Sequence, residues 1–144
     1  MQRTSATDIP HSGTSALPII ALTMGDAAGI GPEVLVRTAA SEGIRSVCQL
    51  VAVGHPSVLE RAARVTGTSL RIEEVSGFDS LRERAVASTG HAESWSLPCI
   101  KACSDDVAAV PPGAIDRRAG QAAYDCLVAA AKAALAGQID GICT

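Results

Sequence analysis

Apolar residues gather in short uninterrupted runs along this chain, and these runs alternate with segments whose apolar positions repeat at helical spacing. The near-continuous apolar run at residues 47–53 predicts a parallel strand that is covered on both faces, and strands are also predicted at residues 17–23, 69–75, 97–102 and 139–143. The helical spacing predicts helices at residues 32–41, 56–66 and 116–136. Each predicted helix is followed by a glycine, a common C-terminal stop, at Gly43, Gly67 and Gly137. The alternation indicates an α/β fold, with a parallel or mixed sheet flanked by helices.

A glycine-rich turn joins the first predicted strand to the first predicted helix, with the sequence Met-Gly-Asp-Ala-Ala-Gly-Ile-Gly-Pro-Glu at residues 24–33. Glycine brings bare backbone close to a ligand, and the free N–H groups of a helix start favour a phosphate or carboxylate. The candidate cofactor-binding residues are therefore Gly25, Asp26, Gly29, Gly31 and Glu33. Structural interpretations remain open: the glycines can form an ordinary turn, Asp26 can bond its own backbone, and Glu33 can complement the helix dipole.

The residues around the glycines resemble the opening motif of the 4-hydroxythreonine-4-phosphate dehydrogenase family, which is similar in fold to the isocitrate and isopropylmalate dehydrogenases. Ala27 stands where that family usually has proline, a change that loosens the turn but removes no functional group. A second block, at residues 113–115, 119–124 and 136–144, resembles the family's later helix and strand. Residues 76–112 match poorly, and Gly90-His91-Ala92-Glu93 is interpreted as a chance likeness to a later family motif.

In the family the strand of the second block continues into Thr-Ala-Pro-x-x-Lys, whereas the sequence here ends at Thr144. The resemblance therefore implies that residues 17–144 are an N-terminal portion of the dehydrogenase fold that ends in mid-strand. It places Thr144 as a candidate substrate residue, at the strand end where open α/β sheets bind ligands. Residues 1–16 are polar and lack the apolar core of a secretion signal, so we expect a disordered extension there.

The resemblance implies an oxidation that uses NAD or NADP and a divalent metal ion (zinc, magnesium or cobalt). The family oxidises the secondary alcohol of a phosphorylated hydroxy acid to a ketone, with subsequent decarboxylation, in pyridoxal phosphate (vitamin B6) synthesis. Its metal-binding histidines and main substrate contacts come later than this sequence, so we expect no catalytic or metal-binding residue within the chain. Family members are similar in forming homodimers, and we expect a homodimer of the full-length protein.

Two alternatives remain from the sequence. A relative with the same chemistry would act on four-carbon sugar-acid phosphates such as phosphothreonate or phosphoerythronate, and the residues that would decide lie downstream. Alternatively, the 144-residue chain is a truncated, non-catalytic product.

Composition agrees with a cytoplasmic α/β protein. The net charge is −3, and the arginines are scattered, so nothing predicts the clustered basic face that nucleic-acid binding requires. No apolar run approaches the about 20 residues that span a bilayer. Aromatic residues make up only 2% of the chain, so the core is expected to consist of Ala, Val, Leu and Ile, which makes an isolated half-fold marginal.

Several single residues are predicted to have structural roles. The five cysteines, Cys48, Cys99, Cys103, Cys126 and Cys143, have irregular spacing and are interpreted as reduced thiols, with Cys48, Cys126 and Cys143 in the core. Cys99-x-x-x-Cys103 lacks the second Cys/His pair of a metal site. His55 is predicted to be a surface turn residue, and Trp95 and Tyr124 are predicted to be packing residues.

Overall fold

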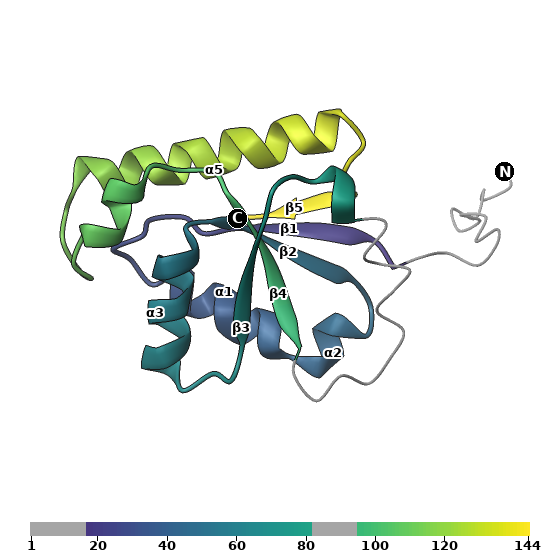
Figure 1. Ribbon diagram of the computed structural model, residues 1–144, viewed down its shortest axis with the longest axis horizontal. Coiled ribbons are helices and arrows are strands. Elements are labelled where there is room, and N and C mark those ends of the chain that lie inside the picture. Colours follow the sequence, from purple (N-terminus) through teal and green to yellow (C-terminus); the bar gives the residue numbers. More distant parts are fainter. Residues whose placement is uncertain (1–16, 82–94) are drawn as a thin grey trace, which may run out of the picture.

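The computed structural model describes residues 17–81 and 95–144, and the predicted extension at residues 1–16 and the Gly90–Glu93 motif lie outside them. Within the described residues the strands form a single parallel sheet in the order β3-β4-β2-β1-β5 (Figure 1). The strands are β1 Ile19–Thr23, β2 Gln49–Gly54, β3 Arg71–Val75, β4 Ser96–Lys101 and β5 Gly141–Cys143. The predicted α/β class is confirmed, and the sheet is parallel rather than mixed.

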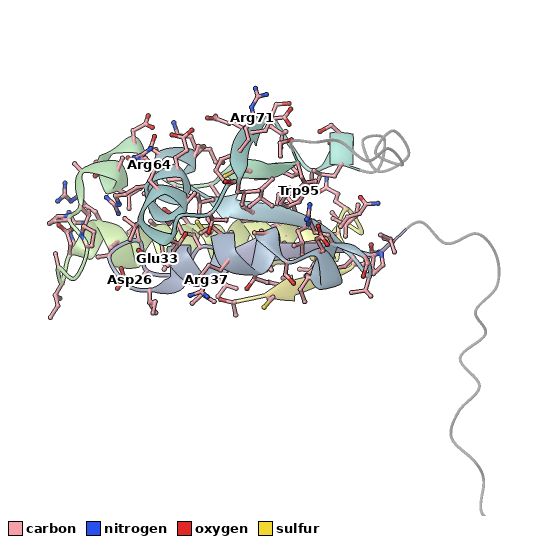
Figure 2. All side chains as sticks on the ribbon, turned by 90° about the horizontal axis from the view of Figure 1, so that it is seen from below. Asp26, Glu33, Arg37, Arg64, Arg71 and Trp95 are labelled. Atoms are coloured by element: carbon pink, nitrogen blue, oxygen red, sulfur yellow. The ribbon has the colours of Figure 1, made fainter. Side chains whose placement is uncertain are left out.

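Helices cover both faces of the sheet. They are α1 Gly31–Ala40, the short α2 Glu42–Arg45, α3 Pro56–Thr66 and α5 Arg117–Leu135, with a 3-10 turn, η1, at Asp105–Ala109. Helices α1 and α3 pack together on one face, and α5 crosses β2, β1 and β5 on the other (Figures 1 and 2). No helix among the described residues combines the length and the apolar character needed to cross a bilayer.

The helix ends follow from local sequence. Pro56 opens α3, and Gly67 ends it in the left-handed conformation with φ +65°. Asp116 caps α5, where its side chain accepts from the backbone N–H of Arg118. The prediction that Gly43 stops the first helix was wrong: α1 already ends at Ala40, and Gly43 lies inside α2. The extended backbone at Ser41 breaks the helix there.

The core consists of aliphatic side chains, as the composition predicted. The centre of β2, Val51 to Val53, is completely buried because both faces of the sheet are covered at that strand. Trp95 packs partly against the core, and the Arg45 guanidinium lies 4.8 Å from the centre of its ring. Tyr124 does not pack as predicted, because its position on α5 turns it away from the sheet and leaves it 64% exposed.

Candidate functional site at the carboxyl edge of the sheet

The glycine turn leaves the carboxyl end of β1 and enters α1 through a close backbone approach. Gly25 has φ +67°, which favours glycine. A Cβ added at Gly31 would lie 2.4 Å from the carbonyl oxygen of Met24, so only glycine fits there. A Cβ at Gly25 would meet no atom within 4 Å, so the turn is open on that side. The turn therefore leaves its backbone uncovered at Gly25, and the cofactor-binding role inferred from the sequence stays a prediction.

Asp26 and Glu33 both belong to this turn (Figure 2). One Asp26 oxygen, Oδ1, accepts from the backbone N–H of Ala28 at 2.9 Å, the turn-closing bond that aspartate commonly makes. Glu33 lies in the first turn of α1, and its Oε2 is buried without a hydrogen-bond partner. Asp26 thus has a structural role, whereas the role of Glu33 in binding stays a prediction.

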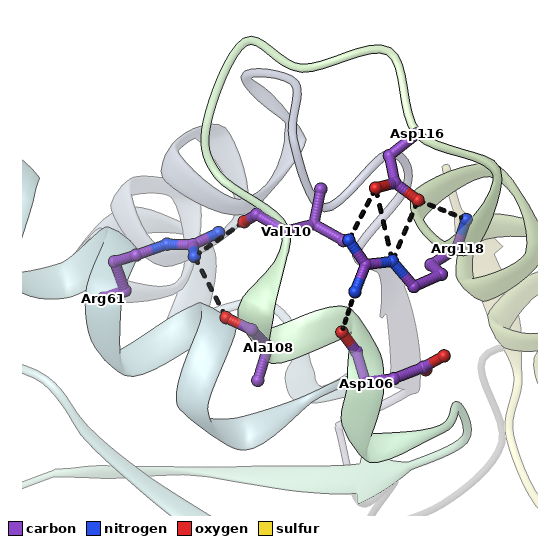
Figure 3. A network of polar contacts seen from close by, with 6 residues as sticks. All are labelled: Arg61, Asp106, Ala108, Val110, Asp116 and Arg118. Carbon is purple, nitrogen blue, oxygen red and sulfur yellow. Dashed lines mark hydrogen bonds and ion pairs between the residues drawn. The ribbon is translucent and has the colours of Figure 1, made fainter.

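Arg61 on α3 holds the turn in place. Its guanidinium donates to the carbonyl oxygen of Ala27 at 3.2 Å. It also donates to the carbonyl oxygen of Val110 at 3.1 Å, with a longer contact to that of Ala108 (Figure 3). The backbone N–H of Gly113 also donates to the Ala28 carbonyl at 2.7 Å. The turn is therefore fixed to two distant segments. The sequence offered no signal for Arg61, because its acceptors lie 34 to 49 positions away.

A second arginine organises the neighbouring segment. Arg118 forms an ion pair with Asp116 at 2.7 Å and donates to the carbonyl oxygen of Asp106 at 3.4 Å, which joins the start of α5 to η1 (Figure 3). The Arg118 side chain, followed by its backbone N–H, lowers the pKa of Asp116 to about 2. The Asp116 carboxylate is therefore charged at neutral pH and caps α5 as an anion.

His55 is a buried residue, and the prediction of a surface turn was wrong. It is 5% exposed because η1 folds over the end of β2, and its Nε2 lies 3.0 Å from Oδ1 of Asp105. Lys101, at the end of β4, also forms an ion pair with Asp105. Lys101, and after it His55, lowers the pKa of Asp105. These three residues join the carboxyl ends of two neighbouring strands, β2 and β4.

Among the described residues, three buried polar atoms at this edge have no hydrogen-bond partner: Oγ1 of Thr23, Nδ1 of His55 and the Oε2 of Glu33 already mentioned. Thr23 ends β1 and pairs with Val53 of β2, two positions before His55. Buried polar atoms in native proteins are normally satisfied by protein, water or ligand. The carboxyl ends of β1 and β2 therefore carry unused hydrogen-bonding capacity beside the glycine turn.

Thr144 reaches the same edge through β5. Leu22 pairs with Cys143, so Thr144 follows at the level where β1 ends. From β1 the chain proceeds through α1 to β2 on one side, whereas α5 carries it back across the sheet to β5 on the other. Open α/β sheets bind ligands where strand order reverses in this way. The topology thus brings Thr144 and the glycine turn together. The binding roles inferred for Thr144 and for the turn stay predictions.

The other candidate chemistry is less concentrated. No three His, Cys, Asp or Glu side chains among residues 17–81 and 95–144 come together to hold a metal ion. Burial raises the pKa of the Cys99 thiol to about 12. Cys126 is buried as predicted, but Cys143 is exposed because β5 lies at the edge of the sheet. An open groove of about 480 Å³ lies elsewhere, between α3 and the amino end of β3, away from the carboxyl edge.

The parallel sheet and the glycine turn at its carboxyl edge define a protein of the open, doubly wound α/β class. The chain belongs to the family of the pyridoxal phosphate biosynthetic protein PdxA, whose family model matches residues 46–144. The match confirms the resemblance inferred from the motifs.

Individual relatives extend this likeness over most of the chain. It is 32% identical to a D-threonate 4-phosphate dehydrogenase of Cupriavidus necator over 132 residues, 89% of this chain and 35% of the relative. It is 30% identical to a 4-hydroxythreonine-4-phosphate dehydrogenase of Geobacter metallireducens over 127 residues, 88% of this chain and 35% of the relative. The chain therefore spans about a third of the length of these curated relatives.

A solved structure gives the same result for the fold. The crystal structure of a 4-hydroxythreonine-4-phosphate dehydrogenase from Burkholderia phymatum is similar, with a TM-score of 0.73 and 33% sequence identity. The similar region covers 90% of this chain and 36% of that one. The sheet and helices described above thus correspond to one part of a larger dehydrogenase fold.

Proposed function

We propose that this chain is the N-terminal portion of a dehydrogenase that oxidises the secondary alcohol of a phosphorylated hydroxy acid to a ketone, using NAD or NADP and a divalent metal ion. The single observation that supports this best is the likeness to dehydrogenases of both names over about nine tenths of the chain. The open glycine turn at the carboxyl edge agrees with it, because that edge is where this class of sheet binds ligands.

In this proposal the chain supplies part of the cofactor cleft. Gly25 leaves the backbone open toward the cofactor, whereas Gly31 and Gly29 let the turn pack closely on Met24 and Asp26. Arg61 keeps the turn rigid, and Asp26 and Glu33 border it. Thr144 would contact substrate from the neighbouring strand end. The glycine turn would hold the nicotinamide cofactor, which would supply the hydride acceptor for the carbinol carbon. The histidines that the family resemblance places later in the sequence would hold the metal ion, which would supply Lewis-acid polarisation of the alcohol oxygen. The β-keto acid that results can lose carbon dioxide.

Two substrates are compatible with the relatives' names. The first is 4-hydroxythreonine 4-phosphate, which would place the protein in pyridoxal phosphate biosynthesis. The second is a four-carbon sugar-acid phosphate, such as D-threonate 4-phosphate, and several similar relatives carry that name. The two substrates differ in one group, because the first carries an amine where the second carries a hydroxyl. No described residue of this chain is assigned to contact that group.

Turnover of the longer protein is the direct test. The coding sequence would be read past the Thr144 codon, the complete polypeptide purified, and each substrate offered with each cofactor and metal. Oxidation of either phosphorylated acid supports the proposal, and the substrate that is turned over faster decides between the two candidate substrates. No oxidation of either substrate by a folded, metal-loaded protein would refute it.

The isolated chain of 144 residues provides a complementary measurement. We expect it to show no metal-dependent dehydrogenase activity, because the groups that the family resemblance assigns to catalysis are not in it. A full-length protein that is equally inactive would favour the alternative of a non-catalytic chain. Turnover by the isolated chain would contradict our view of where the essential groups lie.

A further inference from the structure

Three of the cysteines gather where the end of β4 meets α5. Cys99 lies within β4, Cys103 follows two positions after its last residue, and Cys126 lies on the buried side of α5. Cys99 and Cys126 are completely buried, whereas Cys103 is half-buried and packs against the same core. Because Cys103 and Cys126 come from separate elements, only the tertiary fold brings their thiols together.

Backbone contacts place the segment after β4 against α5. The N–H of Ala102 donates to the carbonyl oxygen of Gly54 at 3.2 Å, so this segment stays beside the end of β2, the strand that α5 crosses. Ser104 and Asp125, the chain neighbours of Cys103 and Cys126, line one cavity of about 100 Å³. The start of α5 is also joined to η1 through a neighbouring arginine (Figure 3). The two cysteines are thus held near each other by contacts on either side of them.

The two sulfur atoms have unequal surroundings. The Cys126 thiol donates a hydrogen bond to the Cys103 sulfur, and this bond, followed by the Lys101 ammonium, lowers the pKa of Cys103. Desolvation and the carboxylates of Asp125 and Asp105 oppose the shift without reversing it. The same hydrogen bond, followed by burial, raises the pKa of Cys126. Cys103 is therefore the sulfur that ionises, and Cys126 is the proton donor that stabilises its thiolate.

We propose that Cys103 and Cys126 form a reversible redox pair, which a peroxide oxidises to a disulfide between the end of β4 and α5. Cysteines that respond to oxidants combine thiolate character, access to solvent and a second thiol nearby. Cys103 keeps part of its surface in solvent, so an oxidant reaches it directly, whereas Cys126 reacts only through Cys103. Cys99 takes no part, because burial raises the pKa of its thiol to about 12 and keeps it protonated. The reduced thiols expected from the sequence are the resting form of this pair.

The chemistry needs no group beyond the two thiols and the peroxide. The Cys103 thiolate attacks one peroxide oxygen, the O–O bond breaks, and the leaving hydroxide takes up a proton as water, which leaves a sulfenic acid on Cys103. The Cys126 sulfur then attacks the sulfenic sulfur, the S–S bond forms, and the hydroxide that leaves takes the Cys126 proton as a second water. Two thiols are oxidised and one peroxide is reduced to water. A small dithiol reverses the reaction by thiol–disulfide exchange.

The disulfide would act on the segment that covers the carboxyl edge of the sheet. It would close the loop from residue 103 to residue 126, which contains η1 and therefore Asp105, the residue that contacts His55. Oxidation would thus fix this segment to α5 by a covalent bond. The inference does not rest on the proposed enzymatic function, because its readout is the state of two sulfur atoms and not turnover.

Peptide mapping of the complete polypeptide after treatment with hydrogen peroxide tests the proposal. Trypsin cuts after lysine and arginine, so the peptides 85–101, 102–117 and 119–132 each contain a single cysteine. We expect 102–117 joined to 119–132 by one disulfide that dithiothreitol removes. This product should form about tenfold faster than any that contains 85–101, because its thiol is buried and protonated.

Three variants sharpen the test, and far-UV circular dichroism checks that each stays folded. Cys103→Ser should abolish the linked product. Cys126→Ala should leave a sulfenic acid on Cys103 that a dione reagent traps, because the second thiol is missing. Cys143→Ser is the matched control, since Cys143 is an exposed cysteine on the edge strand β5, and it should leave the yield unchanged.

The alkylation rate of Cys103 separates a redox pair from mere packing. Cys126→Ala removes the donor that stabilises the Cys103 thiolate, so iodoacetamide should react more slowly with Cys103 at neutral pH. A packing contact alone predicts the opposite, because the smaller alanine opens space around Cys103. Faster alkylation in this variant overturns the proposal. So does peroxide treatment that consumes Cys143 while Cys103 and Cys126 stay reduced, or that links either of them to Cys99 instead.

Discussion

Replacing Gly31 by alanine tests the close approach between the start of α1 and the carboxyl end of β1. The added Cβ would lie 2.4 Å from the Met24 carbonyl oxygen, about 1 Å inside ordinary van der Waals contact. That oxygen is backbone at the end of a central strand, so the strain is relieved only by moving the turn. Overpacking of this kind costs about 1–3 kcal/mol. In a chain of this size it lowers the melting temperature by about 4 °C for each kcal/mol.

Gly120→Ala is the matched control for the same chemical change. Gly120 lies inside α5, and a Cβ there would meet nothing within 4 Å. Alanine should therefore stabilise the chain by about 0.5–1 kcal/mol through helix propensity. Urea and thermal unfolding of both variants, and of Gly31→Ala in the Gly120→Ala background, measure the two opposite effects. If Gly120→Ala raises the unfolding midpoint but Gly31→Ala leaves it unchanged, the close approach of Gly31 to the Met24 carbonyl is refuted.

Three further predictions concern the arginine contact, pH and thiol reactivity. Arg61→Met should lower the free energy of unfolding by about 2–3 kcal/mol in urea, because the carbonyl oxygens of Ala27 and Val110 lose a charged donor. Arg61→Lys should be destabilised as well, and wild-type stability in that variant would contradict the simultaneous contact of one guanidinium with both carbonyls. Arg118 lowers the Asp116 pKa from 3.8 to about 2, so the pair's contribution is complete above about pH 4 and is lost as pH falls toward 2. The stability difference between wild type and Asp116→Asn should therefore shrink over that interval, and a constant difference would argue against the pair. Native-state alkylation, followed by peptide mass spectrometry, should show that Cys143 reacts well before Cys99, because Cys143 is exposed whereas Cys99 is buried and has a raised pKa. Equal alkylation rates at the two cysteines would contradict the described burial.

Local sequence predicted the elements well where a single signal dominates. The strand at β2 followed from a run of apolar residues, and α3 from helical spacing between Pro56 and Gly67. The α1 boundary failed, since Gly43 looked like a stop although the break occurs at Ser41. Short elements such as α2 and η1 were missed because four or five residues carry no periodicity.

The candidate site divides in the same way. Gly25 and Gly31 were predicted to bind the cofactor, and that role stays a prediction, whereas the structure shows why the backbone requires glycine at both positions. The burial of His55 was not predictable, because it depends on Asp105, fifty positions away. Tyr124 was wrongly predicted to be a packing residue, because its exposure depends on which side of α5 meets the sheet.

By itself the sequence determined the α/β class, the glycine turn and the dehydrogenase family, because each depends on residues that are neighbours in the chain. Hydrophobic period and turn chemistry act over only a few positions, and a motif is read the same way in any context. Only the tertiary structure decided strand order, the meeting of Thr144 with the turn, the anchoring by Arg61 and the uncovered side of α5. Those features depend on contacts between distant residues, whose pairing is set by packing of the whole chain and by no local pattern.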